Sequence, residues 1–431
     1  MVLQNIYKGY EMSKQSSVLP MLIIGGLFFI FGFVTWLNGS LIPFLKVLLD
    51  LSSFEALFVS FAFYIAYTVM ALPMATLLEK TGYKNGMAIG LGVMGVGSLL
   101  FIPAAFSASF FLFLVALFTL GTGLTILQTA SNPYIVLMGD IKSAAMRISI
   151  MGLINKSAGV LAPIVFTLLI FSDMGSAASL SEQETANLAS RLVIPYVAMA
   201  VLLFLLIALV KFSGLPELEF ETNDSEDKQS IFSFPRVVLG AVALFFYVGI
   251  EVIAGDTIGL YAQDIGLVNA TALTSYTMVF MVIAYGVGVV SIPKLLSQEK
   301  ALIGSAILGM LFIVGIVFSS TTQTTISAVL WGWSGIGLLP NSITFVALLG
   351  LSNALVWPTI WPLALEGMGK HTAKASALLI MAISGGALLP LLFGKIAQVS
   401  GNMQASYALG ILFYGVILLY GMKWHKKGQW V

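Results

Sequence analysis

The chain has 431 residues, of which 59% are hydrophobic and 9% are charged, and its mean hydropathy of +1.00 is far above that of a soluble domain. The formal net charge of +1 gives no indication of a nucleic acid or another highly charged partner. Cysteine is absent, which excludes disulfides and thiol chemistry. The composition therefore predicts a polytopic membrane protein.

Long apolar runs such as FFLFLVALFTLGTGLTIL predict membrane-spanning helices, because about 20 apolar residues cross the hydrocarbon layer as a helix. Division of the sequence at charged residues and at Gly/Pro breaks gives about twelve spans. They cover residues 18–49, 55–78, 86–104, 107–139, 144–171, 191–212, 236–263, 271–295, 300–320, 340–367, 373–399 and 403–423. The first run is too long for a removable signal peptide, so we expect it to be a retained span.

The basic residues predict the orientation of the chain. With a cytoplasmic N-terminus, only Lys46, Arg191 and Lys395 approach the outer face, and the loops on the inner side carry the other lysines and arginines of the spans and their connections. Loops rich in Lys and Arg stay on the cytoplasmic side. We therefore expect both termini in the cytoplasm.

Two irregular segments interrupt the spans. The acidic, Pro-broken stretch LPELEFETNDSEDKQSIFSFPR predicts a cytoplasmic linker over residues 213–235, between six-helix bundles at 1–212 and 236–431. The stretch 321–342 is expected to form either a re-entrant or an interfacial helix at the outer face.

The two bundles share sequence. SAGVLAPIVF from Ser157 is similar to SGGALLPLLF from Ser384, and FFIFG from Phe28 is similar to FFYVG from Phe245. Two matches in the same order indicate an internal repeat of six plus six helices. The predicted fold class is thus an all-α membrane protein of twelve helices in two pseudo-repeat bundles.

Four stretches carry a resemblance to a known family: WLNGSLIPF, LQTASNPYIVLMG with RISIMGLINKSAG, YVGIEV, and PTIWPLALEGMG. In order and spacing they resemble the fucose permease and glucose/galactose transporter family of the major facilitator superfamily, over essentially the whole chain. The resemblance implies cation-coupled import of a monosaccharide by a monomer, with a sugar-facing amide at Asn155. The acid on span one and the glutamate on span four of fucose permease-like members are replaced here by Gly39 and Gln128.

Span seven contains two carboxylates, Glu251 and Asp256, although an ionised group at the bilayer centre costs roughly 2.5–3.5 kcal/mol on insertion scales. They are separated by about 140° around a regular helix, so we expect the glycines of AGDTIG to let the helix break. The register that aligns Phe28 with Phe245 places Asp256 at the position of Gly39. We therefore expect the coupling acid to have moved to Asp256.

Lys156 lies near the middle of span five and is too deep to reach either surface, so it needs an anion, either Glu251 or Asp256. One lysine and two acids leave one negative charge, which a coupling Na⁺ or H⁺ would neutralise. The alternative is a structural ion pair with the second acid permanently protonated. No cofactor is expected beyond this coupling ion.

The sequence favours Na⁺ as the coupling ion, because this ion takes several oxygen ligands. The tentative set is Asp256, Thr257, Ser40 and Asn38. Proton coupling needs only one suitable carboxyl group and stays open.

A sugar site is predicted from amides and tryptophans. Gln128 and Asn132 are four residues apart and share a helix face, as do Asn353, Trp357 and Trp361. Indoles stack on the apolar face of a sugar ring while amides bind its hydroxyls. The predicted substrate-binding residues are Asn38, Gln128, Asn132, Asn155, Lys156, Glu251, Asn353, Trp357 and Trp361. The alternatives are amides that only join helices and tryptophans that only fill space.

Together these features predict a symporter in the bacterial inner membrane that imports an aldohexose such as glucose or galactose by alternating access. Its partners would be the sugar, the cation and membrane lipid. A proton-coupled symporter, or one for fucose or N-acetylglucosamine, stays open because the same groups suit these sugars. An enzyme that transfers glycosyl groups is disfavoured, because its carboxylates would lie near an interface rather than at mid-depth.

Overall fold

The computed structural model describes residues 18–137, 144–171, 182–215, 230–267, 270–292, 295–368, 371–428 and 430. In this part of the chain all regular structure is helical, and twelve segments are long and apolar enough to cross a membrane. The prediction of an all-α protein with twelve spans is confirmed. Most of the predicted linker, residues 216–229, lies outside the described residues.

The helices of the first half form six spans and two short elements. They are α2 (Val18–Trp36), α3 (Asn38–Leu48), α4 (Ser53–Ala56), α5 (Phe58–Ser107), α6 (Phe110–Leu137), α7 (Ala144–Phe171), α8 (Glu182–Ser190) and α9 (Val193–Phe212). The first span consists of α2 and α3. Helix α5 contains the second and third spans and turns at Gly82, where φ is 77°, a value that glycine adopts without strain.

The second half has more helix breaks. Its elements are η3 (Ile231–Ser233), α10 (Pro235–Asp256), α11 (Ile258–Asp264), η4 (Ala270–Ala272), α12 (Thr274–Ser291), α13 (Gln298–Phe318), α14 (Thr325–Trp331), η5 (Gly332–Ser334), α15 (Asn341–Asn353), α16 (Val356–Leu365), α17 (Thr372–Met381), η7 (Ala382–Ser384), α18 (Gly385–Ser400), α19 (Met403–Ser406), α20 (Leu409–Met422) and η8 (Trp424–Lys426). The expected break beside the acids of span seven is present, since α10 ends at Asp256 and α11 begins at Ile258.

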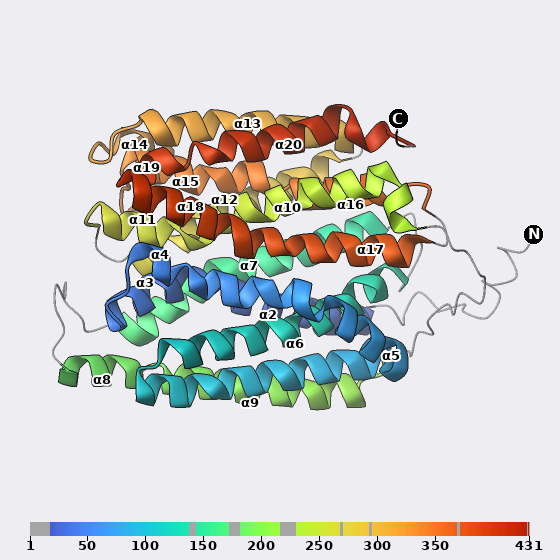
Figure 1. Ribbon diagram of the computed structural model, residues 1–431, viewed down its shortest axis with the longest axis horizontal. Coiled ribbons are helices and arrows are strands. Elements are labelled where there is room, and N and C mark those ends of the chain that lie inside the picture. The colour runs from blue at the N-terminus through green and yellow to red at the C-terminus, as the bar shows by residue number, and fades with distance from the viewer. Residues whose placement is uncertain are drawn as a thin grey trace, which may run out of the picture.

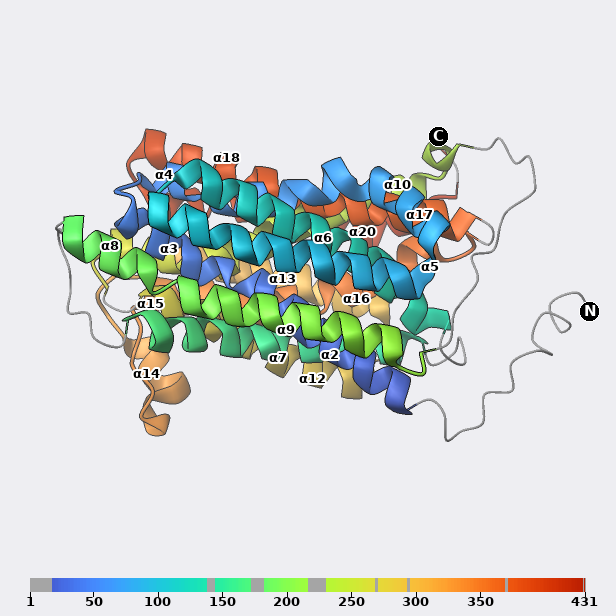
Figure 2. The same ribbon diagram turned by 90° about the horizontal axis from the view of Figure 1, so that it is seen from below.

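Equivalent spans pack together in the two halves (Figures 1 and 2). Helix α2 packs on α7 in the first half as α10 packs on α18 in the second, and α5 packs on α6 and α9 as α13 packs on α15 and α20. The halves meet mainly where α7 contacts α12 and where α5 contacts α18. This pairing agrees with the predicted repeat, whose domain boundaries stay a prediction.

The stretch at 321–342 forms the short helix α14, which projects from one end of the bundle (Figure 2). The ring of Trp331 contacts Tyr276 and Phe280 of α12 at centroid distances of 5.7 and 6.0 Å. Trp333 and Val329 are exposed. Of the two expected arrangements, these contacts favour a helix that lies at the interface over one that re-enters the bundle.

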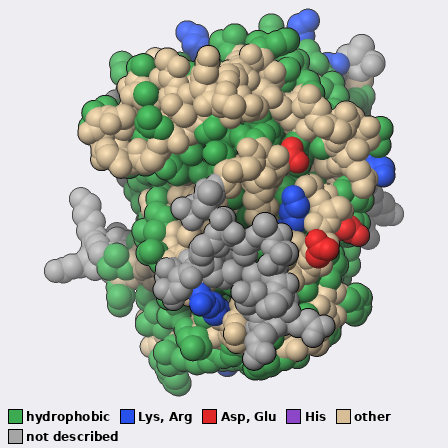
Figure 3. All heavy atoms as spheres, turned by 90° about the vertical axis from the view of Figure 1, so that its left-hand side faces the viewer, with side chains coloured by type: hydrophobic (Ala, Val, Ile, Leu, Met, Phe, Trp, Pro, Cys, Tyr) green, Lys and Arg blue, Asp and Glu red, His purple; other side chains and the backbone are tan. Residues whose placement is uncertain are grey.

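The described chain begins and ends at the same end of the bundle, with the start of α2 and the end of α20 on the right of Figure 1. Figure 3 shows the opposite end, which is formed by α3, α4, α8, α11 and α14 and carries only scattered Lys and Arg side chains. We refer to it as the outer end, in line with the orientation that the basic residues predict.

Gly32 tests the packing of α2 on α7. A Cβ atom there would collide with the main-chain carbonyl of Asn155, which cannot move aside as a flexible side chain can. We expect Gly32→Ala to lower the free energy of unfolding by about 1–3 kcal/mol, the cost of overpacking, seen as a lower melting temperature in detergent. Gly26→Ala on the same helix is the control, because nothing lies within 4 Å of its added Cβ. Equal melting of the two variants would contradict the packing.

Candidate functional site

An ion pair between Lys156 and Glu251 joins the two halves at mid-depth. Lys156 Nζ on α7 lies 2.8 Å from Glu251 Oε1 on α10, and each side chain is 10% exposed. The Tyr247 hydroxyl donates to the same carboxylate oxygen at 2.7 Å. The lysine nitrogen also lies 4.2 Å from the centroid of the Trp36 ring, a cation–π distance. Of the two acids that could balance Lys156, the structure pairs it with Glu251.

Asp256 has a different environment one and a half turns further along the chain. It is fully buried, and the hydroxyl of Ser60 on α5 donates to its Oδ2 at 2.8 Å. Its Oδ1 has no hydrogen-bond partner in the described part of the chain. A buried carboxyl with a single neutral donor is poorly compensated if it is ionised.

The other residues of the predicted sodium site have other partners. Ser40 donates to the carbonyl of Thr271 at 2.5 Å, and Thr257 donates to the carbonyl of Ile253 at 2.6 Å. Thr257 also shares a 2.9 Å hydrogen bond with the Tyr407 hydroxyl. Asn38 is buried, and its Nδ2 has no partner among the described residues. Hydrogen bonds therefore join Asp256 to Ser60 rather than to the three predicted oxygen donors.

Two tryptophans form an aromatic wall beside the ion pair. The rings of Trp357 and Trp361 on α16 are stacked, with centroids 5.2 Å apart and an interplanar angle of 26°. Trp357 lies 6.4 Å from the ring of Tyr247, which is bonded to Glu251. Both indoles are partly exposed, as a sugar-stacking surface requires.

Asn353 lies on a different helix from these tryptophans and bonds to a different residue. Helix α15 ends at Asn353 and α16 begins at Val356, so the predicted stripe is divided by a helix break. Asn353 is fully buried and accepts a 2.6 Å hydrogen bond from Tyr414 on α20. Its Nδ2 is unpartnered among the described residues.

The remaining amides lie on α6 and α7. Gln128 donates to the hydroxyl of Tyr67 at 3.0 Å, and Asn155 donates to the carbonyl of Phe28 at 3.3 Å. Asn132 is half-buried, one turn from Gln128. All three lie in the first half, whereas the aromatic wall lies in the second.

Sequence reasoning missed five residues whose side chains bond to predicted site residues: Ser60, Tyr67, Tyr247, Tyr407 and Tyr414. Tyr247 could have been found, because it precedes Glu251 by four residues and so lies on the same helix face. Ser60 and Tyr67 lie on α5, far from their partners in sequence, and only the fold reveals the contacts.

We call the contact surface between the two halves, where α7 meets α12 and α5 meets α18, the seam. It is closed from mid-depth to the outer end. Most of the hydrogen bonds that join the halves within the described ranges fall in this part. Four of them lie near the outer end: Ser40 to Thr271, Thr167 to Thr271, Gln263 to Pro43, and Ser275 to Val160. Gly39 packs so closely that an added Cβ would collide with Thr274 Oγ1 and lie 2.9 Å from the Gly255 carbonyl oxygen.

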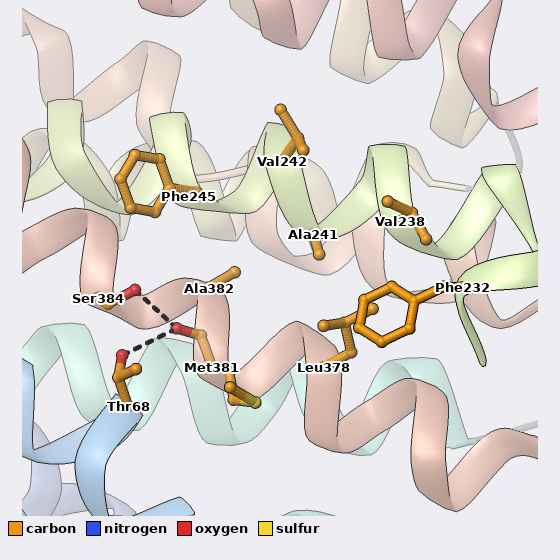
Figure 4. Close-up of a pocket in the computed structure, with 10 residues that line it drawn as sticks. All are labelled: Thr68, Phe232, Val238, Ala241, Val242, Phe245, Leu378, Met381, Ala382 and Ser384. Carbon is orange, nitrogen blue, oxygen red and sulfur yellow. Dashed lines mark hydrogen bonds between the residues drawn. The ribbon is translucent and has the colours of Figure 1, made fainter. Parts of the chain in front are cut away.

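An apolar cleft of about 310 Å³ lies further from the outer end, between α10, α17 and α5 (Figure 4). Its lining includes Phe245, Met381 and Thr68, and Thr68 reaches across the seam to the Met381 carbonyl at 3.4 Å. None of the predicted site residues lines this cleft.

Twelve spans in two similarly packed sets, with buried charges where the sets meet, define a helical membrane transporter. The sequence matches the Major Facilitator Superfamily over residues 24–391. The chain belongs to this superfamily, as its motifs predicted, and it is a transporter rather than an enzyme.

Relatives and solved structures agree with this assignment. The chain is 33% identical over 427 residues to the putative glucose/galactose transporter of Helicobacter pylori, covering 97% of this chain and 100% of the relative. It is 32% identical over 401 residues to the glucose/galactose transporter of Brucella abortus, covering 92% of each. The fold is similar to the crystal structure of the Escherichia coli fucose:proton symporter, with a TM-score of 0.72 and 22% identity over 96% of this chain and 100% of the other.

The ion pair makes a testable prediction. We expect Lys156→Met to destabilise the protein by about 3–5 kcal/mol, because it leaves the buried Glu251 carboxylate unpaired. The double variant Lys156→Met with Glu251→Gln should recover most of this loss, because no charge is then left alone. Melting temperatures in detergent measure both effects. A double variant that is no more stable than Lys156→Met would show that the pairing is not what Lys156 contributes.

Proposed function

We propose that the chain is a proton-coupled symporter that imports a monosaccharide by alternating access between its two halves. The observation that carries this proposal is the Lys156–Glu251 pair, which lies between the halves beside the stacked indoles of Trp357 and Trp361. Charged groups, an amide at Asn155 and an aromatic wall together supply the hydrogen bonds and the stacking surface that a sugar requires.

The substrate we propose is an aldohexose such as glucose or galactose. The relatives from H. pylori and B. abortus, which are named for these two sugars, are 33% and 32% identical to the chain. The L-fucose-proton symporter of E. coli strain K12 is 26% identical over 428 residues, covering 94% of the chain and 93% of the relative. The stronger similarity therefore favours an aldohexose over fucose.

We propose H⁺ rather than the Na⁺ that the sequence favoured. The E. coli and Haemophilus influenzae relatives are named as proton symporters, and the sodium assignment has no such support. The geometry points the same way, because hydrogen bonds join Asp256 to Ser60 while Ser40 and Thr257 donate to main-chain carbonyls. A proton on Asp256 neutralises the carboxyl without a further ligand.

The location follows from the same reasoning. The twelve spans make the chain an integral membrane protein. We propose that it lies in a bacterial inner membrane as a monomer with both termini in the cytoplasm. Sugar and proton would enter from the outer end, where the seam is closed in this structure.

Uptake into proteoliposomes tests the function. With labelled glucose or galactose, we expect accumulation with a pH gradient, acidic outside, and none with a Na⁺ gradient alone. Accumulation driven only by Na⁺ would reject the proton assignment. The absence of counterflow with every hexose in a panel would reject sugar transport.

Asp256→Asn tests the coupling group. The amide cannot take up and release the proton, so we expect pH-driven accumulation to be lost while sugar counterflow persists. Asp50→Asn is the control, because Asp50 is exposed with φ at 50°, a conformation that Asn also tolerates. Accumulation by Asp256→Asn at the wild-type level would disprove this role.

Gly39→Val tests closure of the outer end. The added side chain would collide with Thr274 and the Gly255 carbonyl, so the seam should stay open. Overpacking of about 1–3 kcal/mol predicts a fall in transport rate of roughly fivefold to a hundredfold. Because the chain has no cysteine, Ser275→Cys introduces a single thiol, at a position that is 6% exposed in this structure. This thiol should react faster with a maleimide in the Gly39→Val background than in the background with Gly39. Gly26→Val is the control, and unchanged labelling of Ser275→Cys in the Gly39→Val background would contradict the model of closure.

A further inference from the structure

Asp256 is bonded across the seam to a residue of the other half. Ser60 lies at the outer end of the second span, is fully buried, and donates to Asp256 Oδ2 at 2.8 Å. The two residues are 196 positions apart in the chain. This bond can exist only while the halves are together at this depth, where Gly39 packs against Gly255.

The other groups around Asp256 do not replace this donor. Lys156 on α7 and Glu251 on α10 act on it electrostatically, but they are paired with each other. Tyr64, one turn beyond Ser60 on α5, has a buried hydroxyl without a partner among the described residues. From α3, η4 and α12, the seam residues Ser40, Thr271 and Thr274 are not titratable, and Tyr407 is bonded to Thr257 instead.

A hydrogen-bond donor stabilises a carboxylate more than it stabilises the neutral acid. When the outer end is closed, Ser60 is the donor that Asp256 has, so it lowers the free energy of the ionised form in this state. A symporter must release its proton to the inside while the outer end is closed. The residue that stabilises the carboxylate at this stage therefore bears on the release step.

We propose that Ser60 is a positioning residue for proton release: by donating to Asp256 across the closed seam, it allows the carboxyl to lose its proton toward the cytoplasm. In this step the O–H bond of Asp256 breaks, the proton passes to water on the inner side, and the carboxylate that remains keeps the Ser60 hydrogen bond. The inference rests on the proposed proton coupling and adds a residue to it.

Ser60→Ala tests the inference in proteoliposomes. Without the donor, a more alkaline interior is needed to draw the proton off, so we expect pH-driven uptake at neutral internal pH to fall at least about tenfold. Raising the internal pH by one to two units, roughly the range of a hydrogen-bond effect on a carboxyl, should restore most of the rate. Counterflow, which does not require proton release, should stay within about twofold of wild type.

Two matched variants complete the experiment. Ser60→Thr keeps the hydroxyl and should transport like wild type. Ser98→Ala, also buried on α5 but bonded only to the Met94 carbonyl of its own helix, should leave the pH profile unchanged.

Each outcome decides the inference. Wild-type uptake by Ser60→Ala would overturn it, and so would an equal loss of uptake and counterflow that internal pH does not relieve, because Ser60 would then be merely structural. If Asp256→Asn is uncoupled while Ser60→Ala behaves as wild type, only the role of Ser60 fails. If Asp256→Asn accumulates sugar normally, the coupling assignment itself fails.

Discussion

A charge inside the bundle must find its compensation inside the bundle, because the surrounding lipid offers neither water nor counter-ions. The Lys156–Glu251 pair meets this requirement between the two halves, with Tyr247 bonded to the same carboxylate oxygen. Once these two charges are paired, Asp256 has no ion-pair partner among the described residues. In the proposed mechanism, this separation into a paired and an unpaired acid leaves Asp256 as the group that takes up and releases the proton.

The architecture of the halves places these groups at the seam. Helix α10 carries both acids and contacts α18 and α20 of its own half as well as α3 of the other. The break between α10 and α11 follows Asp256 directly, so this carboxyl lies where regular helix ends. The substrate-facing candidates come from both halves, the amides on α6 and α7 and the tryptophans on α16. A ligand between them would contact both halves and so favour their closure, as coupling by a shared conformational change requires.

Most of the fold could be predicted from the sequence, because each membrane span is a long apolar run, and few other structures contain such runs. The span-seven break could be predicted from the glycines beside Asp256, and the need of Lys156 for an anion followed from its depth. The choice of Glu251 as that anion did not follow, because both acids lie on one span. The helix break after Asn353 has a signal in Pro358, which supplies no N–H to the carbonyl of Ala354 four residues earlier. What the spacing of Asn353, Trp357 and Trp361 did not show is that this break gives Asn353 partners different from those of Trp357. The role of Ser60 could not be predicted from the sequence, because a serine in an apolar helix is recognised as a hydrogen-bond donor to another span only when its tertiary partner is known.

The bonds that close the outer end are of a different kind from the central ion pair. Three of the four that lie near this end run from an uncharged side chain to a main-chain carbonyl, and the fourth joins two threonines. Water can replace either partner when the halves part, so each bond is worth only about 0.5–1.5 kcal/mol net. Charge also acts across this end, because Lys46 of α3 is attracted by Asp264 of α11 and Lys395 of α18 lies 5.4 Å from the centroid of the Phe54 ring of α4. The hydrogen bonds at this end are therefore individually weak, whereas the buried Lys156–Glu251 pair cannot lose one partner without leaving a charge uncompensated.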